Sequence, residues 1–414
     1  MSRAEPSDRM TRAVVVAIIA SALSVMLSAG IRQGFGLFLT PITAELGVGR
    51  ETFGIAAAIS NLMFGVPVMG FLAERFGSRL VLGTGGAIYA AGLLLVTQWV
   101  ATAGLITGLG ILVGIGLAAT TYVVVLGALV QLVSPRQRGT VFGIITAMGS
   151  AGFLVMPPVA QWLVDTYGWQ QAIRIEAVLI LSVVLLSLGL PGKQKKGQQT
   201  AAGKVMEPEV PLWSFVREGF TKPSYLLLVS GFVVCGFHIA FIGTHLPVYL
   251  EDNGIGHIRG AALAFIGAFN LVGSLTFGWL ADRLPRRFLL SFIYGMRGVI
   301  LLIYLLTPIT VGSTLLFSAA MGLLWLATVP VTSGTIALLF GPRYLAIMYG
   351  FVFFSHQVGA FFGAWWSGRV YDATGSYDLG FYVAIALGVY GLLVHLPIRE
   401  KPVEMKLTQA HAAA

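Results

Sequence analysis

The chain has 414 residues, of which 57% are hydrophobic and 10% are charged, and its mean hydropathy is +0.85. Soluble domains carry about 25% charged residues, so this composition excludes an ordinary soluble enzyme and indicates a polytopic membrane protein. The net charge of +9 does not indicate a nucleic-acid partner, because the positions of the basic residues explain it, and a single cysteine, Cys235, permits no intramolecular disulfide.

Apolar runs separated by short polar segments follow one another along the whole chain. A run of roughly 20 apolar residues crosses the hydrocarbon core, and lipid offers backbone groups no partners, so each run is expected to be a helix. We predict twelve spans, at residues 13–40, 52–72, 80–98, 103–133, 139–163, 170–190, 223–250, 259–281, 288–307, 312–340, 344–371 and 377–397.

A polar and basic stretch at residues 191–222 divides these spans six and six. The predicted organisation is an N-terminal six-helix bundle at 1–190, a cytoplasmic linker at 191–222, a C-terminal six-helix bundle at 223–398 and a cytoplasmic tail at 399–414. The tail is expected to be disordered.

The distribution of positive charge predicts the orientation. With both termini in the cytoplasm, twenty of the 26 Lys and Arg residues lie on the cytoplasmic side, as the positive-inside rule requires. The basic residues left for the membrane and the exterior are Arg32, Arg50, Arg174, Arg259, Arg297 and Arg369. An alternative interpretation treats the basic start and first apolar run as a secretory signal, whose cleavage would leave eleven spans and destroy the repeat described next.

The two halves of the chain repeat each other. "GFLAERFGSRLV" begins at Gly70 and "GWLADRLPRRFL" at Gly278, an offset of 208 residues. At an offset of 207, "SPRQRGTVFG" corresponds to "GPRYLAIMYG", and Asp165, Gly168 and Gly36 correspond to Asp372, Gly375 and Gly243. This repeat predicts two units of parallel orientation with a site at their interface near the bilayer midplane.

The duplicated motif between spans 2 and 3 and between spans 8 and 9 predicts a conformational latch. Its glycines allow close helix approach, and its acidic and basic side chains can make charge-assisted bonds and cap a neighbouring helix end. The predicted latch residues are Gly70, Glu74, Arg75, Arg79, Gly278, Asp282, Arg283 and Arg287. The alternative is a solvated loop that obeys the positive-inside rule.

At this motif the chain resembles the major facilitator superfamily over its full length. The resemblance implies an all-α polytopic fold in which two pseudo-symmetric six-helix bundles surround a central cavity and work by rocker-switch alternating access. "IRQGFGLFLTPITAELG" is similar to the end of the first helix in the bacterial monocarboxylate transporter and oxalate–formate antiporter group, with Arg32 in the place of a basic residue. The chain departs from that group in its eighth span, which lacks an arginine before the turn, whereas the ninth contains Arg297.

Two arginines inside apolar spans point to an anionic substrate. Arg32 and Arg297 are buried cations by their position, and among the 17 acidic residues only Glu176 lies inside a predicted span. A substrate carboxylate would supply the missing negative charge, which the fork-shaped guanidinium binds with two hydrogen bonds. The alternative for Arg297 is a bridge to helix backbones.

Further polar residues in the spans are candidates for the same site. His356 and Tyr122 are predicted to bind substrate, and His238, His356 and Glu176 are candidates for proton coupling, because histidine titrates near neutrality. The alternatives are helix-to-helix hydrogen bonds for the histidines and core packing for Tyr122.

The sequence therefore predicts a multi-pass carrier of small organic anions, most simply monocarboxylates, in a bacterial inner membrane, by proton symport or anion exchange. The alternatives are an efflux carrier of drug-like compounds and a non-transporting membrane receptor. No nucleotide loop, metal-ligand cluster or nucleophile–base pair is found, so we expect no enzyme activity, catalytic residue, metal or cofactor. The expected partners are the anionic substrate, the lipid bilayer and protons, with no nucleic acid, and the expected assembly is a monomer.

Overall fold

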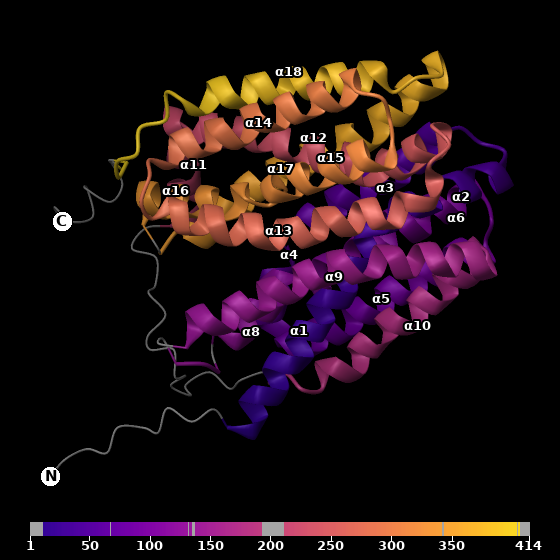
Figure 1. Ribbon diagram of the computed structural model, residues 1–414. Coiled ribbons are helices and arrows are strands. Elements are labelled where there is room, and N and C mark those ends of the chain that lie inside the picture. The colour runs from indigo at the N-terminus through magenta and orange to yellow at the C-terminus, as the bar shows by residue number, and fades with distance from the viewer. Residues whose placement is uncertain are drawn as a thin grey trace, which may run out of the picture.

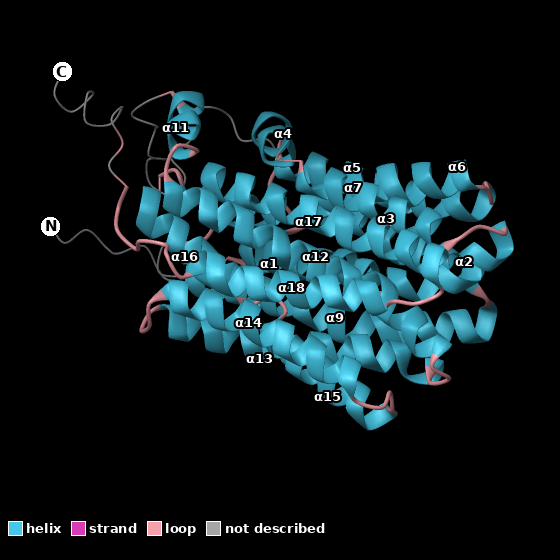
Figure 2. Ribbon diagram, turned by 90° about the horizontal axis from the view of Figure 1, so that it is seen from above, coloured by secondary structure: helices cyan, strands magenta, loops and turns pink. Residues whose placement is uncertain are grey.

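The computed structural model describes residues 11–66, 68–130, 132–134, 137–192, 211–341, 343–403 and 405. Within this part of the chain every regular element is a helix, and the helices run broadly along one direction (Figures 1 and 2). Residues 193–210 of the predicted linker and 406–414 of the predicted tail lie outside the described residues.

The first half of the chain forms the elements that match the first six predicted spans. These are α1 (Arg12–Gln33), η1 (Phe35–Phe38), α2 (Leu39–Leu46), α3 (Arg50–Gly65), α4 (Val68–Phe76), α5 (Ser78–Gln98), α6 (Thr102–Leu105), η2 (Ile106–Leu112), α7 (Val113–Thr120), α8 (Tyr122–Leu129), α9 (Arg138–Tyr167) and α10 (Trp169–Ser187).

The second half begins with a short helix, α11, that the sequence did not predict. Its elements are α11 (Leu212–Gly219), α12 (Pro223–Asp252), η3 (Gly256–Ile258), α13 (Arg259–Ala281), α14 (Arg286–Leu306), α15 (Val311–Leu324), α16 (Thr328–Phe340), α17 (Leu345–Thr374) and α18 (Asp378–His395). α11 packs on α17, and Phe215 of α11 stacks on Tyr344 with ring centroids 3.6 Å apart.

By length and composition, eleven helical stretches among the described residues can each cross a membrane, and the bent pair α3–α4 would be a twelfth. The chain bends by 50° between α3, which ends at Gly65, and α4, which begins at Val68. Other spans are interrupted as well: η1 follows α1, η2 is a π-helix within the fourth span, and α15 and α16 are separated by one turn. The predicted spans therefore correspond to real helices, several of which are broken.

The same helix pairs pack together in both halves. α1 packs on α9 as α12 packs on α17, and α5 packs on α10 as α14 packs on α18. Figure 1 shows the helices from α12 to α18 gathered above α1, α5, α8, α9 and α10, with α11 and α16 at one end and α2 and α6 at the other. We name these the α11 end and the α2 end.

The two halves meet along α3 with α17, α9 with α13, and η1 with α12. At the last of these contacts two glycines related by the repeat lie against each other, because a Cβ atom on Gly36 would overlap the carbonyl oxygens of Gly243 and Thr244. The pseudo-twofold axis of the molecule therefore passes close to this contact, and only glycine at position 36 permits so close an approach.

Candidate functional site

Arg32 lies near mid-depth between the two halves. Arg32 is one residue from the end of α1, and its neighbour Phe64 lies 14 residues after Arg50, the first residue of α3. Because α3 begins at the α2 end and a helix rises 1.5 Å per residue, Phe64 lies about 20 Å from that end. Nη2 of Arg32 donates to Oδ1 of Asn61 at 2.6 Å, and its guanidinium carbon lies 5.2 Å from the centre of the Phe64 ring. Among the described residues no carboxylate forms an ion pair with Arg32, although the side chain is partly buried.

A row of rings leads from Arg32 across to the second half. Phe64 of α3 meets Phe353 of α17 edge to face at 5.3 Å, and Phe353 stacks on the His356 ring at 5.8 Å with an interplanar angle of 9°. His356 is 6% exposed, and its Nδ1 has no hydrogen-bond partner among the described residues. The structure thus brings Arg32 and His356 to the same inter-bundle region, joined by two phenylalanines.

Gln357 lies beside this row in the contact between α3 and α17. A Cβ atom on Gly65 would come within 2.5 Å of Gln357 Cγ, so the two helices touch here. The Gln357 side chain is fully buried, and neither its oxygen nor its nitrogen finds a partner in the described chain. A buried unpaired amide costs free energy unless something binds it, so Gln357 is a further polar group available at this interface.

Arg297 lies elsewhere, in the interior of the second half. It is fully buried on α14, and its Nη2 donates to the carbonyl oxygens of Leu324 and Trp325, each at 2.5 Å. These are carbonyls released by the break between α15 and α16. This placement favours the helix-bridging interpretation that the sequence left open.

His238 makes its hydrogen bond within the second half. Its Nε2 lies 2.7 Å from the carbonyl oxygen of Ala384 on α18, and the side chain is fully buried. This contact is the helix-to-helix hydrogen bond that we held as the alternative for the histidines.

Glu176 lies on α10 in an apolar pocket lined by residues that include Phe35, Phe53 and Ile173. It is fully buried, and neither carboxyl oxygen has a hydrogen-bond partner among the described residues. It lies in the first half, as does Tyr122, which begins α8 with its hydroxyl against Gly149 of α9. Gly149 is the repeat equivalent of His356.

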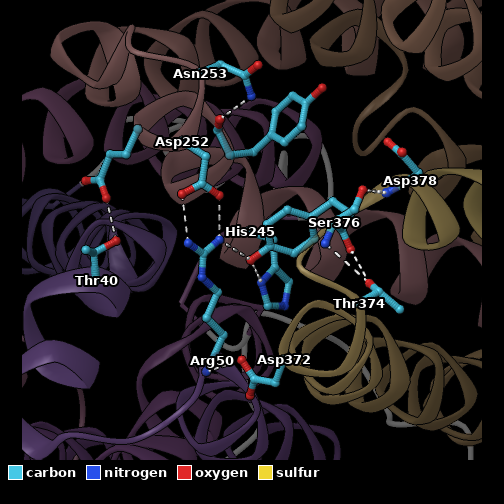
Figure 3. Close-up of polar contacts among 12 residues, drawn as sticks. Thr40, Arg50, His245, Asp252, Asn253, Asp372, Thr374, Ser376 and Asp378 are labelled. Atoms are coloured by element: carbon cyan, nitrogen blue, oxygen red, sulfur yellow. Dashed lines mark hydrogen bonds and ion pairs between the residues drawn. The ribbon is translucent and has the colours of Figure 1, made fainter.

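A polar cluster closes the α2 end between α3, α12 and α17 (Figure 3). Arg50 binds both oxygens of Asp252, at 2.7 and 2.8 Å, lies 3.5 Å from the ring centre of Tyr371, and donates to the Tyr377 hydroxyl at 3.2 Å. The hydroxyl of Tyr377 in turn lies 3.0 Å from Nδ1 of His245.

The same cluster caps the N-terminus of α3 from the other half of the molecule. The two oxygens of Asp372 accept hydrogen bonds from the backbone N–H groups of Arg50 and Glu51, at 2.9 and 2.8 Å. The Glu51 side chain accepts from Trp365 at 2.9 Å and pairs with Arg369 at 3.2 Å. We call the contacts of Arg50, Glu51, Asp252, Arg369 and Asp372 the first seam.

A second set of contacts lies between α9 and α13 at the same end. Arg259 pairs with Asp165 at 2.6 Å, and Gln161 accepts from the backbone N–H of Gly260 at 2.6 Å and donates to the His257 carbonyl at 2.9 Å. We call the contacts of Gln161, Asp165 and Arg259 the second seam. Asp165 and Asp372 are repeat equivalents, so the two seams are pseudo-symmetric counterparts that both join the halves at the N-terminus of a helix.

The predicted latch residues lie toward the α11 end. Arg79 donates from Nε to the Leu190 carbonyl and from Nη2 to the Leu188 carbonyl, at 2.8 and 2.9 Å, and so caps the end of α10. The guanidinium carbon of Arg283 lies 4.0 Å from the centre of the Trp279 ring. The backbone N–H of Arg287 donates to Oε1 of Glu400 at 2.8 Å. Glu74, Arg75 and Asp282 are exposed, and α4, which contains Gly70, has no buried residue. Gly278 has open space around it apart from Pro330.

Sequence reasoning did not find Asn61, Phe64 or the first seam. Asn61 and Phe64 are single residues in an apolar span, without charge or a motif. The correspondence of Asp165 with Asp372 was the available signal for the seams, because it marked two acidic residues at equivalent helix ends.

The same helix pairs pack together in two groups of apolar helices, and Arg32 lies between the groups without a carboxylate partner among the described residues. This arrangement defines a polytopic α-helical membrane protein built on a repeat. The family model of the Major Facilitator Superfamily matches residues 21–364, and the chain belongs to that family. The predicted membership and the predicted all-α polytopic fold are therefore confirmed, and the chain is a multi-pass secondary transporter of a family that carries small molecules and is not enzymatic.

Relatives match along nearly the whole chain. The chain is 26% identical to the Uncharacterized MFS-type transporter YcxA of Bacillus subtilis (strain 168), over 89% of this chain and 91% of that protein. It is 30% identical to Monocarboxylate transporter 13 of Bos taurus, over 95% and 91% of the two chains. A crystal structure of a bacterial homologue of the human lysosomal transporter Spinster, described as inward-facing and unoccupied, shares the fold with a TM-score of 0.73 at 15% identity, over 94% of each chain.

Proposed function

We propose that the chain carries small organic anions, and monocarboxylates in particular, across a bacterial inner membrane by proton symport or anion exchange. The observation that carries the proposal is Arg32, a partly buried guanidinium at mid-depth that has Asn61 and Phe64 as neighbours and no carboxylate partner in the described chain. A cation in such a place needs a counter-charge, and a carboxylate that binds and leaves supplies one. The names of relatives such as Monocarboxylate transporter 13 support the same substrate class.

The proposed site contains Arg32 with Asn61 and Phe64 from the first half, and His356 with Gln357 from the second. The guanidinium would bind the carboxylate in a fork, and His356 would donate to it from the opposite bundle. A substrate held by both halves is what alternating access requires, because its binding then depends on how the halves are placed. Tyr122 stays a candidate for this site, whereas we assign Arg297 a structural role.

We further propose that the termini and the α11 end face the cytoplasm. The positive-inside distribution supports this orientation. The two seams then close the extracytoplasmic side, whereas Glu74, Arg75 and Asp282 of the predicted latch are exposed at the cytoplasmic side. In this orientation the described conformation faces inward.

The proposal is tested by titrating purified variants with a panel of small carboxylic acids and measuring binding as a shift in melting temperature. Arg32→Gln is expected to weaken binding by roughly 30-fold or more, since removing one partner of a desolvated charge pair costs about 2–5 kcal/mol. Arg32→Lys is expected to keep part of the affinity, because the charge remains and the fork is lost.

Arg297→Gln is the matched control, since it removes a second arginine from the interior. It is expected to lower the melting temperature and leave affinity unchanged, because each lost charge-assisted bond to a carbonyl costs about 1.5–3 kcal/mol of stability. Wild-type affinity in Arg32→Gln would overturn the anion site. Binding of lipophilic cations in place of acids would favour the efflux carrier.

A further inference from the structure

The hydrogen bonds at the α2 end fix the protonation of His245. Its Nε2 lies 2.7 Å from the carbonyl oxygen of Ala364 on α17. A carbonyl oxygen only accepts hydrogen bonds, so Nε2 carries a hydrogen and donates it.

The other ring nitrogen is an acceptor by the same reasoning. Arg50 can only donate, so the Tyr377 hydroxyl oxygen accepts from Nη1 of Arg50 at 3.2 Å. The hydroxyl hydrogen of Tyr377 then remains for Nδ1 of His245, 3.0 Å away. With a hydrogen on Nε2 alone, the His245 imidazole is neutral while the first seam is closed.

A protonated imidazole does not fit this network. It would donate from both nitrogens, so the Tyr377 oxygen would face two cationic donors, Arg50 and His245, and the phenol hydrogen would lose its acceptor. The titratable and charged groups around His245 are Arg50 and Glu51 of α3, Tyr249 and Asp252 of α12, Tyr371 and Asp372 of α17, Tyr377, and Asp378 of α18.

The carboxylates of this group are already engaged. Both oxygens of Asp252 bind Arg50, both oxygens of Asp372 cap α3, and Glu51 binds Trp365 and Arg369. Asp378 is exposed. The positive charge of a protonated His245, a side chain only 1% exposed, would therefore be buried beside Arg50 without a carboxylate of its own.

We propose that His245 is a proton-binding site whose occupancy opens the gate at the α2 end. The neutral side chain completes the closed first seam, and separation of the halves admits water and a proton to it. The proposal rests on the proposed function only for the statement that this end faces the exterior. Acid outside then increases the fraction of molecules open to the exterior, because histidine in water titrates near neutrality.

The test measures the distance between the halves against pH. Spin labels are attached at Ala44→Cys on α2 and Ala373→Cys on α17, two exposed positions at the α2 end, in a Cys235→Ser background. In lipid nanodiscs without substrate, the longer-distance population is expected to rise about fivefold or more as the pH falls from 8 to 5, a coupling typical of linked sites.

His245→Gln is the decisive variant. Glutamine can donate to Ala364 and accept from Tyr377 without a charge, so its distance distribution is expected to be independent of pH. A wild-type distance distribution at pH 8, together with a cooperative thermal unfolding transition, shows that the variant is folded. His238→Gln, on the same helix but bonded to α18, is the matched control and is expected to keep the full pH response.

A pH response that persists in His245→Gln, or a wild-type distance that does not change with pH, would overturn the proposal. The measurement needs no substrate. If the panel of acids fails to bind while the pH response of the gate stands, the proposed function falls and the proton site remains.

Discussion

Glu176 illustrates what burial does to a single carboxyl group. It is surrounded by apolar side chains, and neither oxygen is hydrogen-bonded within the described part of the protein. An isolated carboxylate in such a medium costs far more free energy than a neutral carboxylic acid, so loss of a proton from Glu176 requires a change in its surroundings. Because Phe35 of η1 lines the same pocket, movement of the broken first span would change the surroundings of this acid.

We predict from this that Glu176 carries the coupled proton. Glu176→Gln keeps the shape and neutrality of the group but cannot release a proton. Uptake driven by an inward pH gradient in proteoliposomes should collapse in this variant, whereas counterflow exchange of substrate should survive. His356→Gln, tested in parallel, addresses the second candidate. Gradient-driven uptake at the wild-type rate in Glu176→Gln would assign coupling to His356 or to plain anion exchange.

Arg32 and Arg297 show what the sequence can and cannot predict about the role of a single residue. Arg32 and Arg297 are alike in the sequence, since each interrupts an apolar run. The difference arises from a tertiary feature, the turn between α15 and α16, which presents two carbonyl groups to Arg297. No periodicity or motif predicts that turn, so the sequence could only leave both roles of Arg297 open. Asn61 was missed for a related reason, because one neutral amide in a span carries no signal of its own.

Among the helices, α4 behaves differently from its neighbours. It bends by 50° from α3, none of its residues is buried, and its Glu74 is exposed, as is Asp282 in the repeat-related turn. Arg79 nevertheless caps α10, so the basic part of the first motif copy is engaged within its own half. The acidic residues Glu74 and Asp282 are exposed, so we propose that they make contacts in a conformation in which the α11 end is closed.

Asp282→Asn should therefore slow transport without changing substrate affinity. In the proposed latch this charge acts in the exchange between conformations, and it lies at the α11 end, away from Arg32. Only differential stabilisation of two states shifts their equilibrium. Turnover and binding are measured in the same proteoliposome preparation. Glu74→Gln, the repeat equivalent, should act in the same direction, and Asp378→Asn at the opposite end is the control. Wild-type turnover in both motif variants would exclude a latch.

The spans were predictable at the level of elements, and their interruptions were not. Lipid imposes length and apolarity on every span, so hydropathy alone located α5, α9 and α12 to within a few residues. The breaks at η1 and between α15 and α16 do not disturb hydropathy, because the residues around them are as apolar as the helices. Helix α11 was missed because it lies in the polar linker.

The whole molecule is closed at one end by two seams related by the internal repeat. The first joins α3 to α12 and α17, and the second joins α9 to α13. If the halves move as rigid bodies, both seams break in the same opening step. Their contributions to the free energy between the closed and open states should then add.

Asp165→Asn and Asp372→Asn, alone and together, test this expectation. Each change should increase the open population, by roughly 0.2–1 kcal/mol for a partly exposed ion pair and about 0.5–2 kcal/mol for a helix cap. The double variant should show the sum of the two shifts, measured with the same pair of spin labels. A double variant no more open than the stronger single variant would mean that the seams open in separate steps.

The glycine contact on the pseudo-twofold axis gives the closed end two layers of different character. Gly36 and Gly243 meet nearer the molecular centre in an uncharged contact made mainly by backbone atoms. The charged seams lie outside this contact and are partly exposed, with 50% of the Asp165 side chain accessible. Dissolved salt weakens interactions between exposed charges over a Debye length of about 8 Å at physiological ionic strength, but it has no effect on steric contact. The ionic composition of the surrounding medium therefore determines how firmly the outer layer holds, whereas the inner layer is indifferent to it.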